Sequence, residues 1–259
     1  MKKALAAAVA AATLLGAAPA QAAAPDPVRA VKKQLVVGHG VKISEVLSSE
    51  VKGKKEVYFE TAGTFGFGTS GVVAADMTIR STVVSKKPTT VRVLMVGKHI
   101  YMRSDALRED LPEGKTWVHM EDSENWRTPS AHPVDIFRPP QLKGLLSHAK
   151  SVRNGVYRGT VTGKQGHQIS GGEITGTFDY RLSTASTGLP TRLHTTVKSV
   201  LSGMLQHTDT RYSAWGHSVT ITEPPEHEVA AMDEFPDSSS EELQEYLEIA
   251  DDTVASIRR

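Results

Sequence analysis

Period-two alternation over most of the chain is the strongest constraint on its fold. From Val51 to about Thr222, apolar and polar residues alternate in runs separated by glycine and proline, a pattern typical of consecutive antiparallel strands. The clearest hairpin pairs Val91–Val96 with His99–Arg103 across Gly97-Lys98, where a glycine at the first turn position suits a type II′ turn. The chain is therefore predicted to be α+β and mainly antiparallel β.

The remaining strands are predicted from the same alternation. Within Glu173–Leu182, the residues Phe178, Tyr180 and Leu182 share one apolar face, so this strand is expected to be half-buried in a sheet. The other strands are expected at Val57–Phe67, Gly71–Val84, Lys115–Met120, Val152–Thr162, Thr191–Val200, Leu205–Ala214 and Ser218–Thr222.

Two helices are predicted beside these strands. The first begins with Asp26 as N-cap and Pro27 at the first helical position, and Gly38 or Gly40 is expected to end it. The second covers Gln141–Ala149. Its apolar stripe at helical spacing is expected to face the sheet and comprises Leu142, Leu145, Leu146 and Ala149.

The two ends of the chain have compositions of their own. Residues 1–22 combine Lys2 and Lys3, an alanine-rich apolar run and an Ala-Gln-Ala site, which is the pattern of a signal peptide cleaved after Ala22. Residues 233–259 carry 9 acidic and 2 basic residues. An acidic linker and an amphipathic helix over Ser240–Ile257 are predicted there, so residues 23–232 are expected to form the main domain.

Composition narrows the class of protein. The segment after residue 22 has 28 basic and 29 acidic residues, a balance that argues against nucleic-acid binding. The chain has no cysteine, so disulfides, thiolate metal sites and a lipoprotein anchor are excluded. No other apolar run has the length of about 20 residues that a transmembrane helix needs. A secreted protein that is not lipid-anchored is expected.

Catalytic and metal-binding patterns are weak. The ten histidines are scattered singly along the chain, and only His99 and His119 are expected to meet, across neighbouring strands. Two ordinary strand residues are the favoured interpretation of that pair, rather than a metal or catalytic site. We expect that the protein is not an enzyme and that it binds no metal and no cofactor.

A large strand-rich surface facing a few apolar helices leaves two interpretations open. A strongly curved sheet encloses a cavity for an apolar guest unless its own side chains fill that space. The same residues would be apolar in either case. The candidate ligand-binding residues are Leu35, Val93, Met95, Leu142, Leu145, Leu146, Phe178 and Tyr180.

Three stretches of the chain resemble a known family. They are Val96–Ser104 with Leu111–Val118, Tyr157–Val161 with Thr187–Leu193, and Arg211–Gly216 with Val219–Pro225. Together they resemble the LolA-like exported actinobacterial proteins, which include the mycobacterial LppX and LprG type lipoproteins. The resemblance spans residues 26–232 and concerns fold more than activity. The lipidated cysteine of the lipoproteins is absent, and the acidic C-terminal helix is not part of the pattern.

The resemblance implies an antiparallel sheet curled into an incomplete barrel, with helices on its concave face and a cavity for acyl chains. The leading hypothesis is a non-enzymatic, exported binding protein that holds or shuttles a lipid or another apolar molecule. The alternative is an extracytoplasmic sensor or regulatory interaction protein on the same scaffold, without ligand transport. In that case a protein partner would bind through the C-terminal helix or the sheet.

Overall fold

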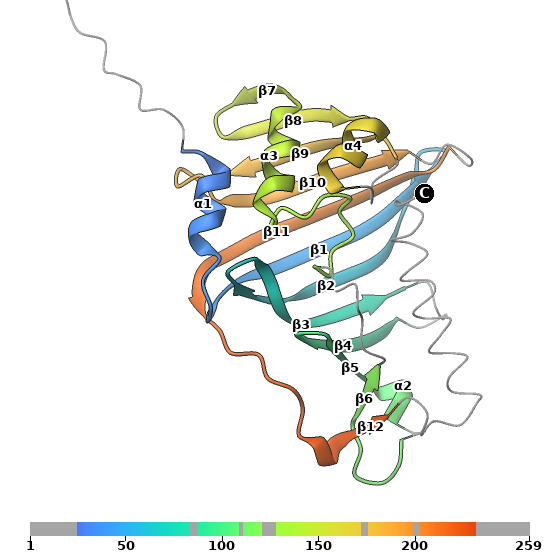
Figure 1. Ribbon diagram of the computed structural model, residues 1–259. Helices are drawn as coiled ribbons and strands as arrows, with labels where there is room; N and C mark the ends of the chain where they lie inside the picture. The colour runs from blue at the N-terminus through green and yellow to red at the C-terminus, as the bar shows by residue number, and fades with distance from the viewer. Residues whose placement is uncertain are drawn as a thin grey trace, which may run out of the picture.

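The computed structural model describes residues 25–82, 88–108, 111–120, 128–171, 176–198 and 203–231. The predicted signal peptide and the predicted helix over Ser240–Ile257 lie outside these residues. Within them, the α+β, mainly antiparallel β architecture predicted from alternation is confirmed, because a single twelve-stranded sheet dominates the described chain (Figure 1).

The sheet has the strand order β12-β6-β5-β4-β3-β2-β1-β11-β10-β9-β8-β7. Neighbouring strands are antiparallel throughout, except for the parallel pair of β12 and β6. The strands are β1 (His39–Val51), β2 (Lys54–Gly68), β3 (Gly71–Ser81), β4 (Thr89–Val96), β5 (His99–Ser104), β6 (Trp117–Met120), β7 (Ala149–Arg153), β8 (Val156–Val161), β9 (Phe178–Thr184), β10 (Pro190–Lys198), β11 (Leu205–Ser218) and β12 (Val229–Ala231).

The helices are short and begin at recognisable caps. In α1 (Pro27–Gln34) the backbone N–H of Val28 donates to the Asp26 carboxylate at 2.9 Å, as the sequence predicts. In α4 (Gly163–Ser170), Thr162 and Gln165 form a capping box. The others are α2 (Asp105–Arg108), α3 (Pro139–Ser147) and the 3₁₀ turn η1 (Glu226–Glu228).

The hairpin predicted around Gly97-Lys98 is confirmed. Strands β4 and β5 pair from Val96↔His99 outwards, and Gly97 has a φ of 59°, a left-handed value that glycine adopts without strain. The predicted ranges for β2, β3, β6, β9 and β10 also overlap the observed strands.

Four predicted elements differ from those observed. The helix predicted over Gln141–Ala149 ends at Ser147, because Ala149 begins β7 and pairs with Gly159 of β8. Val152–Thr162 is not one strand: Asn154 and Gly155 have φ values of 50° and 72° and turn the chain between β7 and β8, as an Asn-Gly pair favours. The helix α1 ends at Gln34, before either glycine, because Leu35 leaves helical geometry and is buried against the core. No strand is formed at 219–222, since after β11 only the Val219 N–H bonds back, to Gly38.

One central strand was not predicted. The sheet begins at His39, well before Val51, and β1 pairs along nearly its whole length with β2 and β11. Its inward-facing positions include the buried Glu45 as well as Val41 and Ile43. A carboxylate at a core position weakens the apolar alternation from which strands are predicted.

The inner face of the sheet is the face that the helices pack against. Figure 1 shows α1, α3 and α4 gathered over the part that contains β7–β11, whereas β3–β6 lie away from them. The buried apolar side chains of both parts form one continuous cluster, which runs from Leu193 on β10 to Val118 on β6. We call α1, α3 and α4, with the inner faces of β1 and β8–β11, the helix-covered half.

Candidate functional site

All eight residues predicted to bind an apolar ligand belong to the inner apolar cluster or pack against it. The sheet nevertheless separates them into two groups. Val93 and Met95 lie on β4, away from the three helices. The other six lie in the helix-covered half and are Leu35, Leu142, Leu145, Leu146, Phe178 and Tyr180.

Close packing fills the helix-covered half with protein side chains. Leu142 and Leu145 of α3 are fully buried, and Leu146 is half-buried against the same cluster. These three members of the predicted stripe therefore face the sheet, whereas Ala149 lies on β7. The hydroxyl of Tyr180 donates to the Leu145 carbonyl at 2.7 Å, and burial raises the pKa of Tyr180 to about 12. This hydrogen bond fixes α3 against β9.

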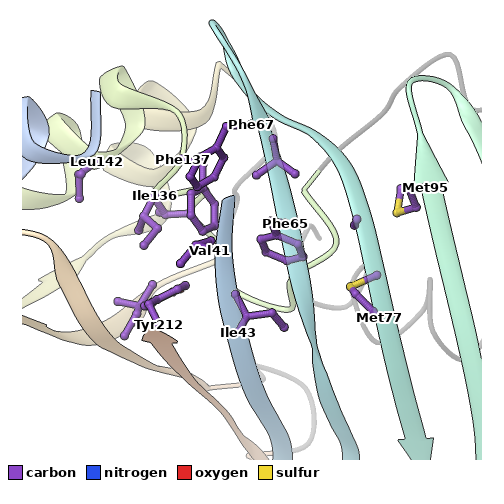
Figure 2. Close-up of a cluster of buried hydrophobic side chains, with 14 of the residues drawn as sticks. Val41, Ile43, Phe65, Phe67, Met77, Met95, Ile136, Phe137, Leu142 and Tyr212 are labelled. Atoms are coloured by element: carbon purple, nitrogen blue, oxygen red, sulfur yellow. The ribbon is translucent and has the colours of Figure 1, made fainter. Parts of the chain in front are cut away.

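Residues 128–138, which we call the plug segment, lie on the inner face beside β1 and β11. Its Ile136 and Phe137 are each 2% exposed. The Phe137 ring lies 5.5 Å from that of Phe65 and 5.8 Å from that of Tyr212, both edge-to-face. Figure 2 shows Phe137 between the side of Leu142 and the strands that carry Val41 and Phe65. Here the expected cavity is occupied by the chain itself.

A buried polar network fastens the plug segment to the sheet. The carboxylate of Glu45 on β1 accepts hydrogen bonds from the Ser130 hydroxyl at 2.7 Å and the Ala131 N–H at 3.0 Å. It also accepts one from the Thr210 hydroxyl of β11 at 2.5 Å. Burial raises the pKa of Glu45, and these three hydrogen bonds lower it to a smaller extent.

His132 completes this network. Its Nδ1 lies 2.9 Å from the Thr195 hydroxyl and its Nε2 lies 2.8 Å from the Thr210 hydroxyl. Since Thr210 already donates to Glu45, it accepts from His132 Nε2–H, and Thr195 donates to Nδ1. Burial lowers the pKa of His132 to about 3, so the ring is neutral in this arrangement. Glu45, Thr210, His132 and Thr195 thus form one directed chain of hydrogen bonds.

Strands β3–β6 present a different inner face, which we call the methionine wall. Two cross-strand rows build it, and each row contains two methionines. One row is Met77, Val93, Met102 and Val118, and the next is Ala75, Met95, Ile100 and Met120. Four of the seven methionines in the chain lie on this surface. Met77, Met95 and Met102 are 2%, 7% and 3% exposed.

Among the described helices, the single turn α2 is the one that packs against β4 and β5. Figure 2 places Met77 and Met95 on strands farther from the helix side than Ile136, Phe137 and Leu142. The methionine wall therefore continues the apolar inner face without the leucine and phenylalanine packing of the helix-covered half.

The predicted meeting of His99 and His119 is confirmed. Their ring centroids are 5.4 Å apart on the outer face of β5 and β6, and His119 also stacks on Tyr101 at 5.0 Å. The described part of the chain contains no group of three or more metal-ligating side chains that could hold an ion. The His99 and His119 rings are tilted by 47° to each other.

Sequence reasoning missed Glu45 and His132 as functional candidates. The available signal was the alternation of Val41, Ile43, Glu45 and Leu47, which places one carboxylate among inward-facing positions. For His132 there was no comparable signal, because the plug segment has no regular period and the hydrogen-bond partners of the His132 ring, Thr195 and Thr210, are distant in sequence.

Comparisons with family models and with curated proteins find no match to this chain. Among solved structures, a DUF1329 family protein from Desulfovibrio piger is 14% identical, covering 76% of this chain and 95% of its own, with a TM-score of 0.30. A LolA superfamily protein from Nitrosomonas europaea is 10% identical, covering 77% and 93%, with a TM-score of 0.30. Similarity this distant supports no argument about function, so the assignment depends on the residues of this chain.

Proposed function

We propose that this protein is a non-enzymatic binding protein that holds a lipid or another apolar ligand against the methionine wall. The observation that carries the proposal is the composition of that wall: two rows of unbranched and β-branched apolar side chains on strands that α1, α3 and α4 leave uncovered. Methionine side chains adapt to irregular apolar shapes because they are flexible and polarisable.

The helix-covered half is the less suitable location for a ligand. Leu142, Leu145 and Phe178 are at most 1% exposed there, and the plug segment adds aromatic rings to the same space. Of the predicted ligand-binding residues, Val93 and Met95 are therefore the two that we retain. Since the methionine wall is itself buried, a ligand that binds there must replace protein side chains that now contact it.

We propose also that the protein acts outside the cytoplasmic membrane after removal of residues 1–22. The basic start, apolar run and Ala-Gln-Ala site support this location. No helix within the described residues is both long enough and apolar enough to span a membrane.

Binding of a fluorescent fatty acid tests the proposed site. Met95→Gln places a polar amide in the wall and should weaken binding about tenfold, because the ligand would then bury an unpaired polar group. The matched control is Leu94→Gln, since Leu94 is 6% exposed against 7% for Met95 but faces the opposite side of β4. Equal affinity for the parent and Met95→Gln proteins would refute the wall as the site.

Mass spectrometry of organic extracts from the purified protein tests the ligand class. We expect an apolar molecule in a fixed ratio to protein, lost in Met95→Gln and kept in Leu94→Gln. Repeated absence of any extractable ligand, together with no affinity for the fatty acid, would favour the sensor or interaction protein instead.

A further inference from the structure

The turn that follows α1 carries two exposed apolar side chains that the proposed function does not use. Val36 and Val37 are 43% and 74% exposed, and Val37 is the most exposed large apolar side chain of the described residues. They are also the only two such side chains that are adjacent in the described sequence. Single exposed apolar residues are common and need no explanation, whereas adjacent ones do.

Contacts on both sides hold this turn in place. Leu35, directly before the two valines, is 6% exposed and belongs to the inner apolar cluster. The Val36 carbonyl accepts a hydrogen bond from the His39 N–H at 3.0 Å, and the Gly38 carbonyl accepts one from the Val219 N–H at 2.9 Å. The turn lies where β1 begins and β11 ends (Figure 1). The exposure of the valines therefore follows from a backbone that is fixed at both ends.

Three cations lie on the exposed face of α1 that leads to this turn. Arg29, Lys32 and Lys33 occupy positions i, i+3 and i+4, which share one face of a helix, and all three are exposed. Val31 belongs to the opposite face and is fully buried. Lys33 and Val37 are at most about 14 Å apart, because four residues of chain span no more than that. We call the three cations together with Val36 and Val37 the α1 surface.

The α1 surface has no negative charge of its own. No Asp or Glu occurs in the sequence between Asp26 and Glu45, and Glu45 is buried in hydrogen bonds to the plug segment. Within the described residues, none of the three cations forms a salt bridge. The helix dipole favours Lys32 and Lys33 in the last turn of α1, but it explains neither Arg29 nor the exposed valines. The α1 surface is therefore complementary to a partner that is both anionic and apolar.

We propose that the α1 surface docks on a membrane that contains anionic lipids. The cations contact lipid headgroups, and Val36 and Val37 enter the boundary between headgroups and acyl chains. A membrane suits this surface better than a protein does, because a stable protein interface needs about 20–30 residues from each partner. Each cation near an anionic membrane strengthens binding about fivefold. Docking through so few residues is weak and reversible, which suits a protein that collects or delivers a lipid.

Flotation with lipid vesicles tests the proposal on the exported protein, whose N-terminus is first determined by peptide mass analysis. We expect binding to vesicles of phosphatidylglycerol and phosphatidylcholine that vesicles of phosphatidylcholine alone do not reproduce. Arg29→Gln and Lys33→Gln should each weaken this binding about fivefold, and added salt should weaken binding of the parent. The matched control is Lys52→Gln, which changes an exposed cation beyond the other end of β1, about 40 Å along the strand. It should bind as the parent does.

A second pair of variants tests the apolar part of the surface. Val37→Ser should weaken vesicle binding about fivefold, because less apolar surface then leaves water on docking. Val152→Ser is the control, since Val152 is 56% exposed on the edge strand β7. Thermal melting checks that each variant keeps its fold. Equal binding by the parent, Lys33→Gln and Val37→Ser proteins, or an equal loss in Lys52→Gln, would overturn the proposal.

A second copy of the chain is the other occupant that these variants can identify. Absence of vesicle binding, together with self-association in analytical ultracentrifugation that Val37→Ser abolishes, would overturn membrane docking in favour of a dimer. Absence of both would overturn the α1 surface as an interaction site. Met95→Gln should bind vesicles as the parent does, so failure of the apolar ligand site and failure of membrane docking are separable.

Discussion

The helix-covered half and the methionine wall are parts of one sheet, yet they are packed with different side chains. In the helix-covered half, Leu142, Phe178 and Leu193 are fully buried in one apolar cluster, and the Tyr180 hydroxyl is hydrogen-bonded to α3. The wall instead offers Met77, Met102 and their neighbours in two rows. Branched and aromatic side chains specify a single packing, whereas methionine tolerates several. Under the proposed function, this difference separates a structural core from the part of the inner face that is proposed to bind the ligand.

The largest expected effect tests whether the helix-covered half is a filled core. Leu145→Asp would bury a carboxylate without a partner and should cost several kcal/mol, on the order of the whole stability of a domain. Leu146→Asp should cost less, because Leu146 is half-buried. Urea unfolding measures the free energy of unfolding of both variants, and thermal melting gives their melting temperatures. A melting temperature for Leu145→Asp within a few degrees of the parent would contradict the filled core.

Cavity-forming substitutions should distinguish the helix-covered half from the methionine wall. Leu142→Ala and Met77→Ala each remove a buried side chain and should lower the free energy of unfolding by about 2–5 kcal/mol. Only Met77→Ala should also change the affinity for the fluorescent fatty acid. If Leu142→Ala changes that affinity and Met77→Ala does not, the ligand lies in the helix-covered half.

The hydrogen-bond network between the plug segment and the sheet should make stability depend on pH. The pKa of His132 falls from 6.5 to about 3 on folding, so the unfolded state binds more protons between these values. Stability from this group is therefore complete above pH 6.5 and is lost as the pH falls towards 3, by a few kcal/mol in total.

Glu45 has the opposite effect on the pH dependence of stability. Burial raises its pKa, so the folded state holds that proton more tightly, and its contribution declines as the pH rises above the ordinary value of 4.5. His132→Gln should accordingly abolish the loss of stability that His132 causes below pH 6.5 and leave the reversed slope of Glu45. Chemical unfolding at several pH values measures how the free energy of unfolding of this variant depends on pH. An unchanged pH profile in His132→Gln would show that His132 is not the titrating group.

The smallest effect is expected on the outer face of β2 and β3, on the side of the sheet opposite to the methionine wall. Arg80 and Glu60 form a salt bridge at 3.0 Å with side chains 52% and 48% exposed. Solvent screening limits such a pair to about 0–1 kcal/mol, so Arg80→Gln should leave both stability and fatty-acid binding nearly unchanged. A loss above 2 kcal/mol would show that β2 and β3 depend on outer-face charges more than on the wall.

The sequence predicted those elements whose signal is local. The β4–β5 hairpin follows from Gly97 and the alternation of Val91, Val93 and Met95, and the start of α1 follows from Asp26 and Pro27. The Asn154-Gly155 turn carried an equally local signal that was overlooked. Strand β1 could not be predicted in the same way, because Glu45 interrupts its apolar face.

The location of the candidate site depends on tertiary structure more than the secondary-structure elements do. The sequence determined that the eight predicted residues are apolar and buried, because amphipathic periodicity alone requires a core on one face. It did not determine that Leu142 packs into a filled half and Met95 into a methionine wall. Those outcomes depend on the register between strands distant in the chain and on a plug segment without any period. Local periodicity therefore decided which side chains are buried, and long-range pairing decided what each of them contacts.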